Sequence, residues 1–161
     1  MTPIQELTQA LHANVLEAAR RAGVAVDETR FASAFTQEAS IGVAALSLSA
    51  DELSDLRGGR NVMFVTLTLP PGIDKTVDGV PIADGAYLLN VSLDETATKA
   101  SARLMTTAGR EIGVLPVEVK PDHPHDRFAV SGHSGPCSAA GDISFTIGRY
   151  TVTVTVMISW C

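Results

Sequence analysis

Alternation between apolar and hydroxyl-bearing side chains in the C-terminal segment constrains the fold of this chain more than any other feature. The segment reads "DISFTIGRYTVTVTVMISW", and Gly148-Arg149 within it fits a two-residue type II′ hairpin turn, which places Ile147 opposite Tyr150. One face is then apolar (Ile143, Phe145, Ile147, Tyr150, Val152, Val154, Val156, Ile158 and Trp160) and the other polar (Ser144, Thr146, Thr151, Thr153, Thr155 and Ser159). A one-residue slip would bury the hydroxyls and expose the valines, so the sequence predicts a fixed register.

Seven alternating segments lie between residue 61 and the end of the chain, separated by Gly, Pro, Asp and Asn. They span residues 61–69, 86–94, 99–107, 110–119, 127–132, 142–147 and 150–160. Short strands at this spacing, without long helical patterns between them, predict an antiparallel β-sandwich over residues 61–161. The fold class is therefore expected to be mainly β with about seven strands. The final strand should be either central in its sheet or an edge that can pair with another subunit.

Residues 77–93 read "VDGVPIADGAYLLNVSL", a turn followed by a strand in a pattern similar to that of immunoglobulin-like modules. The resemblance implies a sandwich of that architecture. It does not extend to the family, because the sequence lacks the buried Cys–Trp–Cys arrangement of true immunoglobulin domains.

Residues 1–60 are expected to form a helical segment that packs on the sheet or on a partner. The first helix should begin at an N-cap on Thr2, with Pro3 and Gln5 in its first turn, and end before Gly23. An apolar stripe runs along it at helical spacing, made of Ile4, Leu7, Leu11 and Val15.

The rest of this segment is harder to assign. Residues 27–40 could form a short helix capped by Asp27, with Phe31 and Phe35 one turn apart, and residues 41–49 either a strand or a buried helix. Ser49 and Glu52 have capping-box spacing and predict another short helix that ends near residue 58.

The chain has 161 residues, a length that suits a single domain. Its formal net charge is -6. Such an acidic chain is not expected to bind nucleic acid, which requires a basic surface. The N-terminus does not resemble a secretory signal, and no apolar run is long enough to span a bilayer, so we expect a cytoplasmic protein without a transmembrane segment. Cys137 and Cys161 are then expected to be reduced thiols, although an oxidising compartment would allow one bridge.

Three histidines and a cysteine gather in "PDHPHD" (121–126) and "SGHSGPC" (131–137). His123, His125, His133 and Cys137 could close a tetrahedral Zn or Cu site, because these metals prefer imidazole and thiolate ligands. If residues 127–132 form a strand, however, the first pair lies roughly 20 Å or more from the second. A polar loop punctuated by prolines is the alternative.

Catalytic motifs are incomplete in this sequence. The segment around Ser134 is one residue short of the G-x-S-x-G nucleophile pattern, and no histidine follows that serine. The acidic residues Asp51, Glu52 and Asp55 are expected at a helix N-terminus on dipole grounds alone. "RGGR" (57–60) lacks the lysine and serine of a phosphate-binding loop. We therefore expect no enzymatic activity and no cofactor other than Zn or Cu at the His/Cys cluster.

The sequence predicts a noncatalytic module that binds a protein partner or a second copy of itself. Two apolar features lead to this expectation, the stripe on the first helix and the long final strand. A metal-binding sandwich that uses the His/Cys cluster is the alternative, and a ligand cavity between the apolar inner faces is a third possibility.

Overall fold

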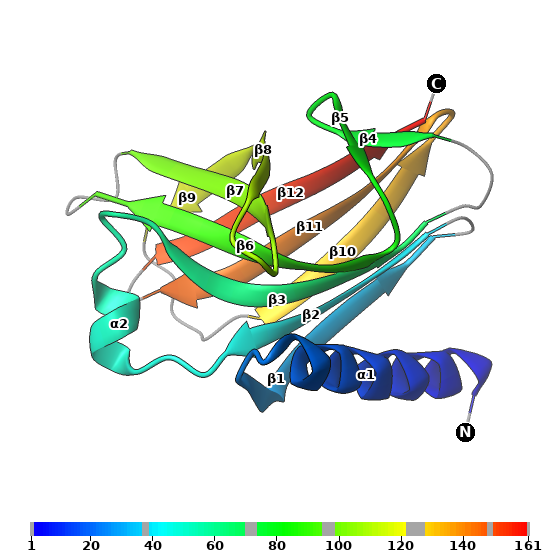
Figure 1. Cartoon of the computed structure of the whole chain (residues 1–161), viewed down its shortest axis with the longest axis horizontal. Coiled ribbons are helices and arrows are strands. Elements are labelled where there is room, and N and C mark those ends of the chain that lie inside the picture. The colour runs from blue at the N-terminus through cyan, green and yellow to red at the C-terminus, as the bar shows by residue number, and fades with distance from the viewer. Residues whose placement is uncertain are drawn as a thin grey trace.

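The chain folds into two antiparallel β-sheets packed face to face, with one long helix against the outer surface of the first sheet (Figure 1). The structure, a computed structural model, describes residues 2–36, 39–69, 74–94, 99–121, 128–147 and 150–160. In these ranges the helices are α1 (Pro3–Ala22) and α2 (Ala50–Ser54). The strands are β1 (Val26–Phe35), β2 (Ser40–Leu46), β3 (Arg60–Thr68), β4 (Lys75–Val77), β5 (Val80–Ile82), β6 (Gly85–Leu93), β7 (Ala100–Thr106), β8 (Glu111–Leu115), β9 (Val117–Lys120), β10 (Phe128–Gly135), β11 (Ser138–Ile147) and β12 (Tyr150–Ser159).

The first sheet has the strand order β1-β2-β3-β6-β7-β8, and the second has the order β10-β11-β12-β4-β5, with β9 also paired to β12. The mainly β, sandwich-like fold with an N-terminal helix is confirmed, but the described residues form twelve strands rather than about seven. The difference has two sources. The sequence did not predict β1, β4 and β5 and left β2 open between a strand and a buried helix, and the segment 110–119 is divided by Pro116 into β8 and β9, which belong to different sheets. An immunoglobulin-like strand arrangement is not supported.

The C-terminal hairpin has the register that its alternation predicts. Ile147 pairs with Tyr150, and the ladder continues without a shift to Ser138 and Ser159. The apolar face enters the main core, where Ile143, Val152 and Val154 are almost completely buried. β12 is internal, with β11 on one side and β9 and β4 on the other. The alternative that β12 is an edge strand open to another subunit is therefore wrong.

The expected helix over residues 27–40 is also wrong, because residues 26–35 form strand β1. Phe31 and Phe35 are four residues apart, a spacing that places side chains on one face of a strand as well as on one face of a helix. Pairing with β2 decides between the two, and β2 in turn pairs with β3 across the expected boundary at residue 60. Residues 26–46 are therefore part of the sandwich and not of a helical segment.

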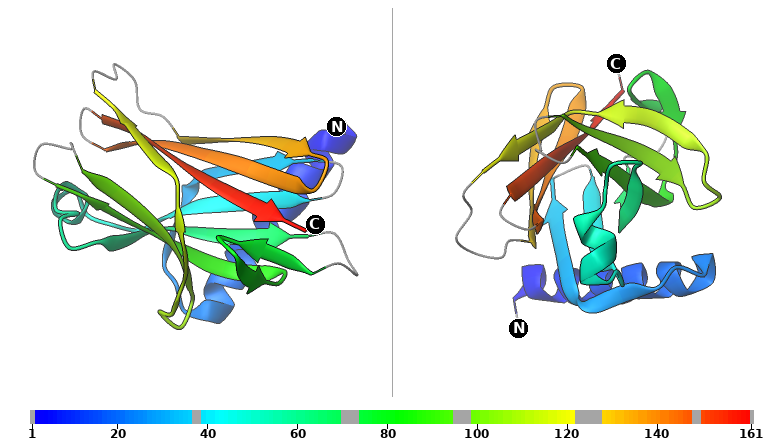
Figure 2. Two further views of the ribbon diagram at one scale, coloured as in Figure 1. Left: turned by 90° about the horizontal axis from the view of Figure 1, so that it is seen from above. Right: turned by 90° about the vertical axis from the view of Figure 1, so that its left-hand side faces the viewer.

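Helix α1 begins and ends where its sequence predicts, with a capping box between Thr2 and Gln5 and a left-handed C-cap at Gly23. It lies across β1, β2 and β3 on the outer face of the first sheet (Figure 2). Its C-terminal half buries Val15 and Ala19 in a second apolar cluster with Ala44, Phe64 and Leu88. Close approach is possible because β2 has a glycine beneath the helix. A Cβ atom at Gly42 would lie only 2.7 Å from Val15 Cγ2 and 3.0 Å from Thr66 Oγ1.

The two sheets meet along both sides of the sandwich. On one side β1 lies beside β10, and a Cβ atom at Gly132 would be 3.1 Å from Ala34 Cβ. On the other side the chain turns at Pro116 from β8 in the first sheet into β9 in the second. The edge of β8 is also engaged, because the backbone N–H of Val114 donates to Asp78 Oδ2 at 3.2 Å from the β4–β5 turn. These contacts cover strand edges that could otherwise pair with other chains.

We predict that Gly42→Ala lowers the free energy of unfolding by about 1–3 kcal/mol, because the added methyl group overpacks the contact between α1 and β2. Gly58→Ala is the matched control, since a Cβ atom there has no neighbour within 4 Å. That substitution should be neutral or slightly stabilising. Urea unfolding measured for both variants tests the prediction, and equal midpoints would contradict the observed docking of α1.

Two threonines on the outer face of β12 should respond oppositely to the same substitution. Thr151 Oγ1 is buried and has no hydrogen-bond partner among the described residues, whereas Thr153 Oγ1 shares a hydrogen bond of 3.1 Å with Ser144 Oγ. Thr151→Val should therefore raise the free energy of unfolding by about 1 kcal/mol, and Thr153→Val should lower it by about as much. Thermal or urea unfolding of the pair gives the sign, and a loss of stability in Thr151→Val would refute the prediction.

Candidate functional site

Two residues of the predicted metal site, His133 and Cys137, lie in the described part of the chain. His133 lies on β10 opposite Ala140, and its Nε2 atom is 3.4 Å from Asp142 Oδ2. Asp142 Oδ1 accepts a hydrogen bond of 2.6 Å from Thr155 Oγ1, so this carboxylate links three neighbouring strands. Among the described residues there is no group of three or more His, Cys, Asp or Glu side chains that could hold a metal ion.

The other members of the predicted ligand set are placed differently. His123 and His125 lie outside the described residues, so their part of the prediction stays a prediction. Cys137 lies in the turn between β10 and β11 and is disulfide-bonded, which removes its thiolate from the ligand set in this form of the protein. The strand expected over residues 127–132 is present as β10, which extends through His133 to Gly135. The expected separation of His133 from His123 and His125 stays a prediction.

The disulfide differs from the expectation of reduced thiols. The carbonyl oxygen of Cys137 accepts a hydrogen bond of 3.0 Å from the backbone N–H of Trp160, and Ser138 pairs with Ser159. Cys161, the other cysteine of the sequence, lies outside the described residues. Disulfides persist mainly in oxidising compartments, so the cytoplasmic location stays a prediction that the state of the thiols can test.

Ser134 occupies a strand position that does not suit a nucleophile. It pairs with Ala139 near the end of β10, and β11 follows after a two-residue turn. Successive side chains of a strand point to opposite faces, so Ser134 and His133 do not face each other. The geometry agrees with the expectation that this serine is not activated.

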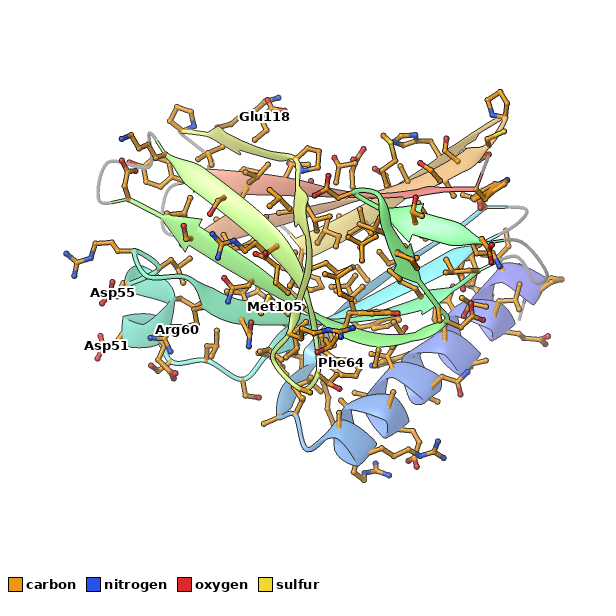
Figure 3. All side chains as sticks on the ribbon, turned by 45° about the horizontal axis from the view of Figure 1, so that its top comes forward. Asp51, Asp55, Arg60, Phe64, Met105 and Glu118 are labelled. Carbon is orange, nitrogen blue, oxygen red and sulfur yellow. The ribbon has the colours of Figure 1, made fainter. Side chains whose placement is uncertain are left out.

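Four of the charged residues around α2 form two ion pairs. Glu52 forms a capping box with Ser49 and an ion pair of 3.1 Å with Arg60, and Asp55 pairs with Arg57 at 3.1 Å. Hydrogen bonds from the Ser49 backbone and side chain lower the pKa of Glu52, and the hydrogen bond and charge of Arg57 lower the pKa of Asp55. Figure 3 shows Asp51, Asp55 and Arg60 on the outside of the molecule around this helix. Both carboxyl groups therefore remain ionised at neutral pH and fix the helix in place.

The N-terminal half of α1 is an exposed apolar surface. Ile4 and Leu7 are 70% and 56% exposed, although they continue the stripe that buries Val15. Residues 3–16 contain a single acidic or basic side chain that is charged at neutral pH, Glu6. Phe35 is also exposed and lies on the same face of the first sheet as α1, because it follows Phe31 by four positions in β1. We call Ile4 and Leu7 the exposed helix pair.

A cavity of about 600 Å³ lies between the sheets at the end of the sandwich where α2 is attached. Its lining combines both sheets and α2: Val26, Asp27, Glu28, Arg30, Ala45, Leu46, Ser47, Leu48, Leu53, Val62, Met63, Phe128, Phe145, Thr146 and Ile147. Sequence analysis allowed such a cavity but assigned no residue to it. The reason is local, since the pattern around Asp27 fits a capped helix as well as a strand.

The mouth of this cavity is shaped by an irregularity in β1. Val26 of β1 pairs with Leu46 of β2, and the next recorded pair is Phe31 with Ala44. More residues of β1 than of β2 therefore lie between these two pairs. The extra residues of β1 form a bulge. Within the bulge Asp27 Oδ1 accepts hydrogen bonds from the Thr29 hydroxyl at 2.6 Å and from the Thr29 backbone N–H at 3.0 Å. These two bonds, with the positive charge of Arg30, lower the pKa of Asp27.

Neither helix in the described ranges is long and apolar enough to cross a membrane. Comparison of the chain with protein-family models, with curated proteins and with solved structures found no match. The function must therefore be argued from the chain's own geometry.

We predict that the folded protein has no reactive thiol until it is reduced, and then two. Cys137→Ser should expose one thiol and lower the free energy of unfolding by about 2–4 kcal/mol, because a covalent constraint on the unfolded chain is lost. Cys161→Ser should give the same loss. Thiol titration in denaturant without reductant, followed by intact-mass measurement, tests this, and two reactive thiols in the untreated wild-type protein would show that the disulfide does not form.

Proposed function

We propose that this protein is a noncatalytic assembly module that pairs with a second copy of itself through the N-terminal half of α1. The observation that supports the proposal is a contrast within the apolar stripe of α1. The C-terminal part of the stripe is buried, whereas its N-terminal part, the exposed helix pair, is exposed. Large apolar side chains exposed together on a helix are typical of contact surfaces.

Charge supports a second copy as the partner. The chain has a net charge of -6, so two copies repel each other over most of their surfaces. The first fourteen residues of α1 carry one formal charge, that of Glu6. Electrostatic repulsion between two copies is therefore smallest where these surfaces meet. The cores of protein interfaces are likewise depleted in charged residues. In a two-fold pair the same patch serves both subunits, so an apolar stripe is complementary to itself.

The exposed helix pair is also accessible without unfolding anything. The backbone of α1 is held by its capping box and by the packing of Val15 and Ala19. Pairing would therefore bury side chains that the helix already presents, without a cost for ordering the segment.

The test compares variants that keep the helix but change one face. The double substitution Ile4→Gln with Leu7→Gln should weaken dimerisation at least about tenfold, because each buried leucine or isoleucine contributes roughly 1.5–3 kcal/mol and tenfold corresponds to about 1.4 kcal/mol. Ala13→Gln is the matched control, since Ala13 is exposed on the opposite side of the same helix. Light scattering coupled to size-exclusion chromatography over a dilution series measures the effect.

We expect a wild-type dimer, a dimer for Ala13→Gln and a folded monomer for the double variant, whose thermal unfolding does not depend on protein concentration. A wild-type monomer at every concentration, or equal dissociation of the control and the double variant, would refute self-association through this surface.

A further inference from the structure

The two ends of the sandwich are packed differently. At the end that contains Ala34, Gly132 and Gly141, small residues allow the sheets to approach, and a Cβ atom at Gly141 would lie 3.2 Å from Ile41 Cγ2. The space between the sheets there is about 20 Å³. At the opposite end the β1 bulge and α2 border the cavity of about 600 Å³. That volume lies within the range of roughly 300–1,000 Å³ that small-molecule sites occupy.

The floor of this cavity is apolar and comes from both sheets. Val62 and Met63 on β3 and Phe145 on β11 are buried members of the core or pack next to it, and Leu48 and Leu53 add half-buried apolar surface from the segment around α2. A ligand that covered these side chains would remove apolar surface from water. The floor therefore favours a ligand with an apolar body.

The charged side chains among the described lining residues are two carboxylates and one guanidinium group. Asp27 and Glu28 line the cavity from the bulge, and Glu28 forms no ion pair with any described residue. Arg30 also lines the cavity, and its Cζ atom lies 5.4 Å from the centroid of the Phe128 ring across the junction of β1 and β10, a contact that leaves its positive charge in place. With two carboxylates and one guanidinium group, the described lining residues therefore carry a net charge of -1. The carboxylate of Asp27 is held in place by Thr29. An ionised group at the mouth of an apolar cavity selects ligands of the opposite charge.

We propose that this cavity is a binding site for small cationic molecules with an apolar body, such as aryl-alkyl or alkyl amines. The apolar part lies against Met63 and Phe145, and the ammonium group lies at the mouth near Asp27 and Glu28. This site is separate from the exposed helix pair, and it does not depend on self-association.

A pair of probes with the same apolar body and opposite charge tests the proposal. 4-Phenylbutylamine is a cation at neutral pH and 4-phenylbutyrate an anion. Titration of the full-length, ¹⁵N-labelled protein with each probe, followed by amide NMR, gives both affinity and location. The amine should bind saturably and shift amides of residues 26–30, 45–48, 62–63 and 145–147, and it should bind at least about tenfold more tightly than the carboxylate.

Two variants separate the charge from the cavity. Glu28→Gln changes an exposed side chain and should weaken amine binding about threefold or more while leaving the carboxylate unchanged or slightly tighter. Glu118→Gln on β9, labelled in Figure 3, is the matched control because Glu118 is exposed and outside the cavity lining, and it should alter neither affinity. Leu53→Trp fills the cavity from its half-buried rim and should abolish binding of both probes.

Each variant is first checked for wild-type thermal unfolding, so that a lost fold is not read as a lost site. The proposal is overturned if the amine does not saturate, if its shifts lie away from these residues, if the carboxylate binds as tightly as the amine, or if Leu53→Trp binds like the wild type.

Discussion

The apolar face of the β11–β12 hairpin is the surface against which the rest of the core assembles. Val152, Val154 and Val156 lie at the centre of the second sheet because β12 has neighbours on both sides. The strands of the first sheet pack their own apolar faces onto it. The strict alternation of the hairpin therefore decides which face of the second sheet meets the first. A slip by one residue would place a row of threonines in the core, and no other part of the fold could compensate for it.

Small and large residues divide the interior into a closed and an open end. Where Ala34, Gly132 and Gly141 face one another, the sheets come together and little space is left. Where β1 bulges and α2 spans the end of the sandwich, Met63 and Phe145 line a cavity instead. The sheets are thus closely packed at one end and leave room for a ligand at the other.

Several polar residues of the types that act in catalysis form structural hydrogen bonds or ion pairs in this protein. Asp142 bonds Thr155 and lies beside His133 across three strands, Asp78 covers the edge of β8, and Glu52 caps α2. Hydrogen bonds of this kind hold the carboxylates in fixed positions. The carboxylates of the β1 bulge are different in one respect, because they line a cavity that is large enough for a ligand.

The sequence by itself determined the first helix, its caps and the register of the C-terminal hairpin, because local spacing and alternation are sufficient for these. Only the tertiary structure decided that residues 26–35 form a strand, since Phe31 and Phe35 fit either element until β2 pairs with them. The cavity could not be predicted for the same reason: its residues come from β1, β3, β11 and α2, and only the packing of two sheets brings such distant segments together.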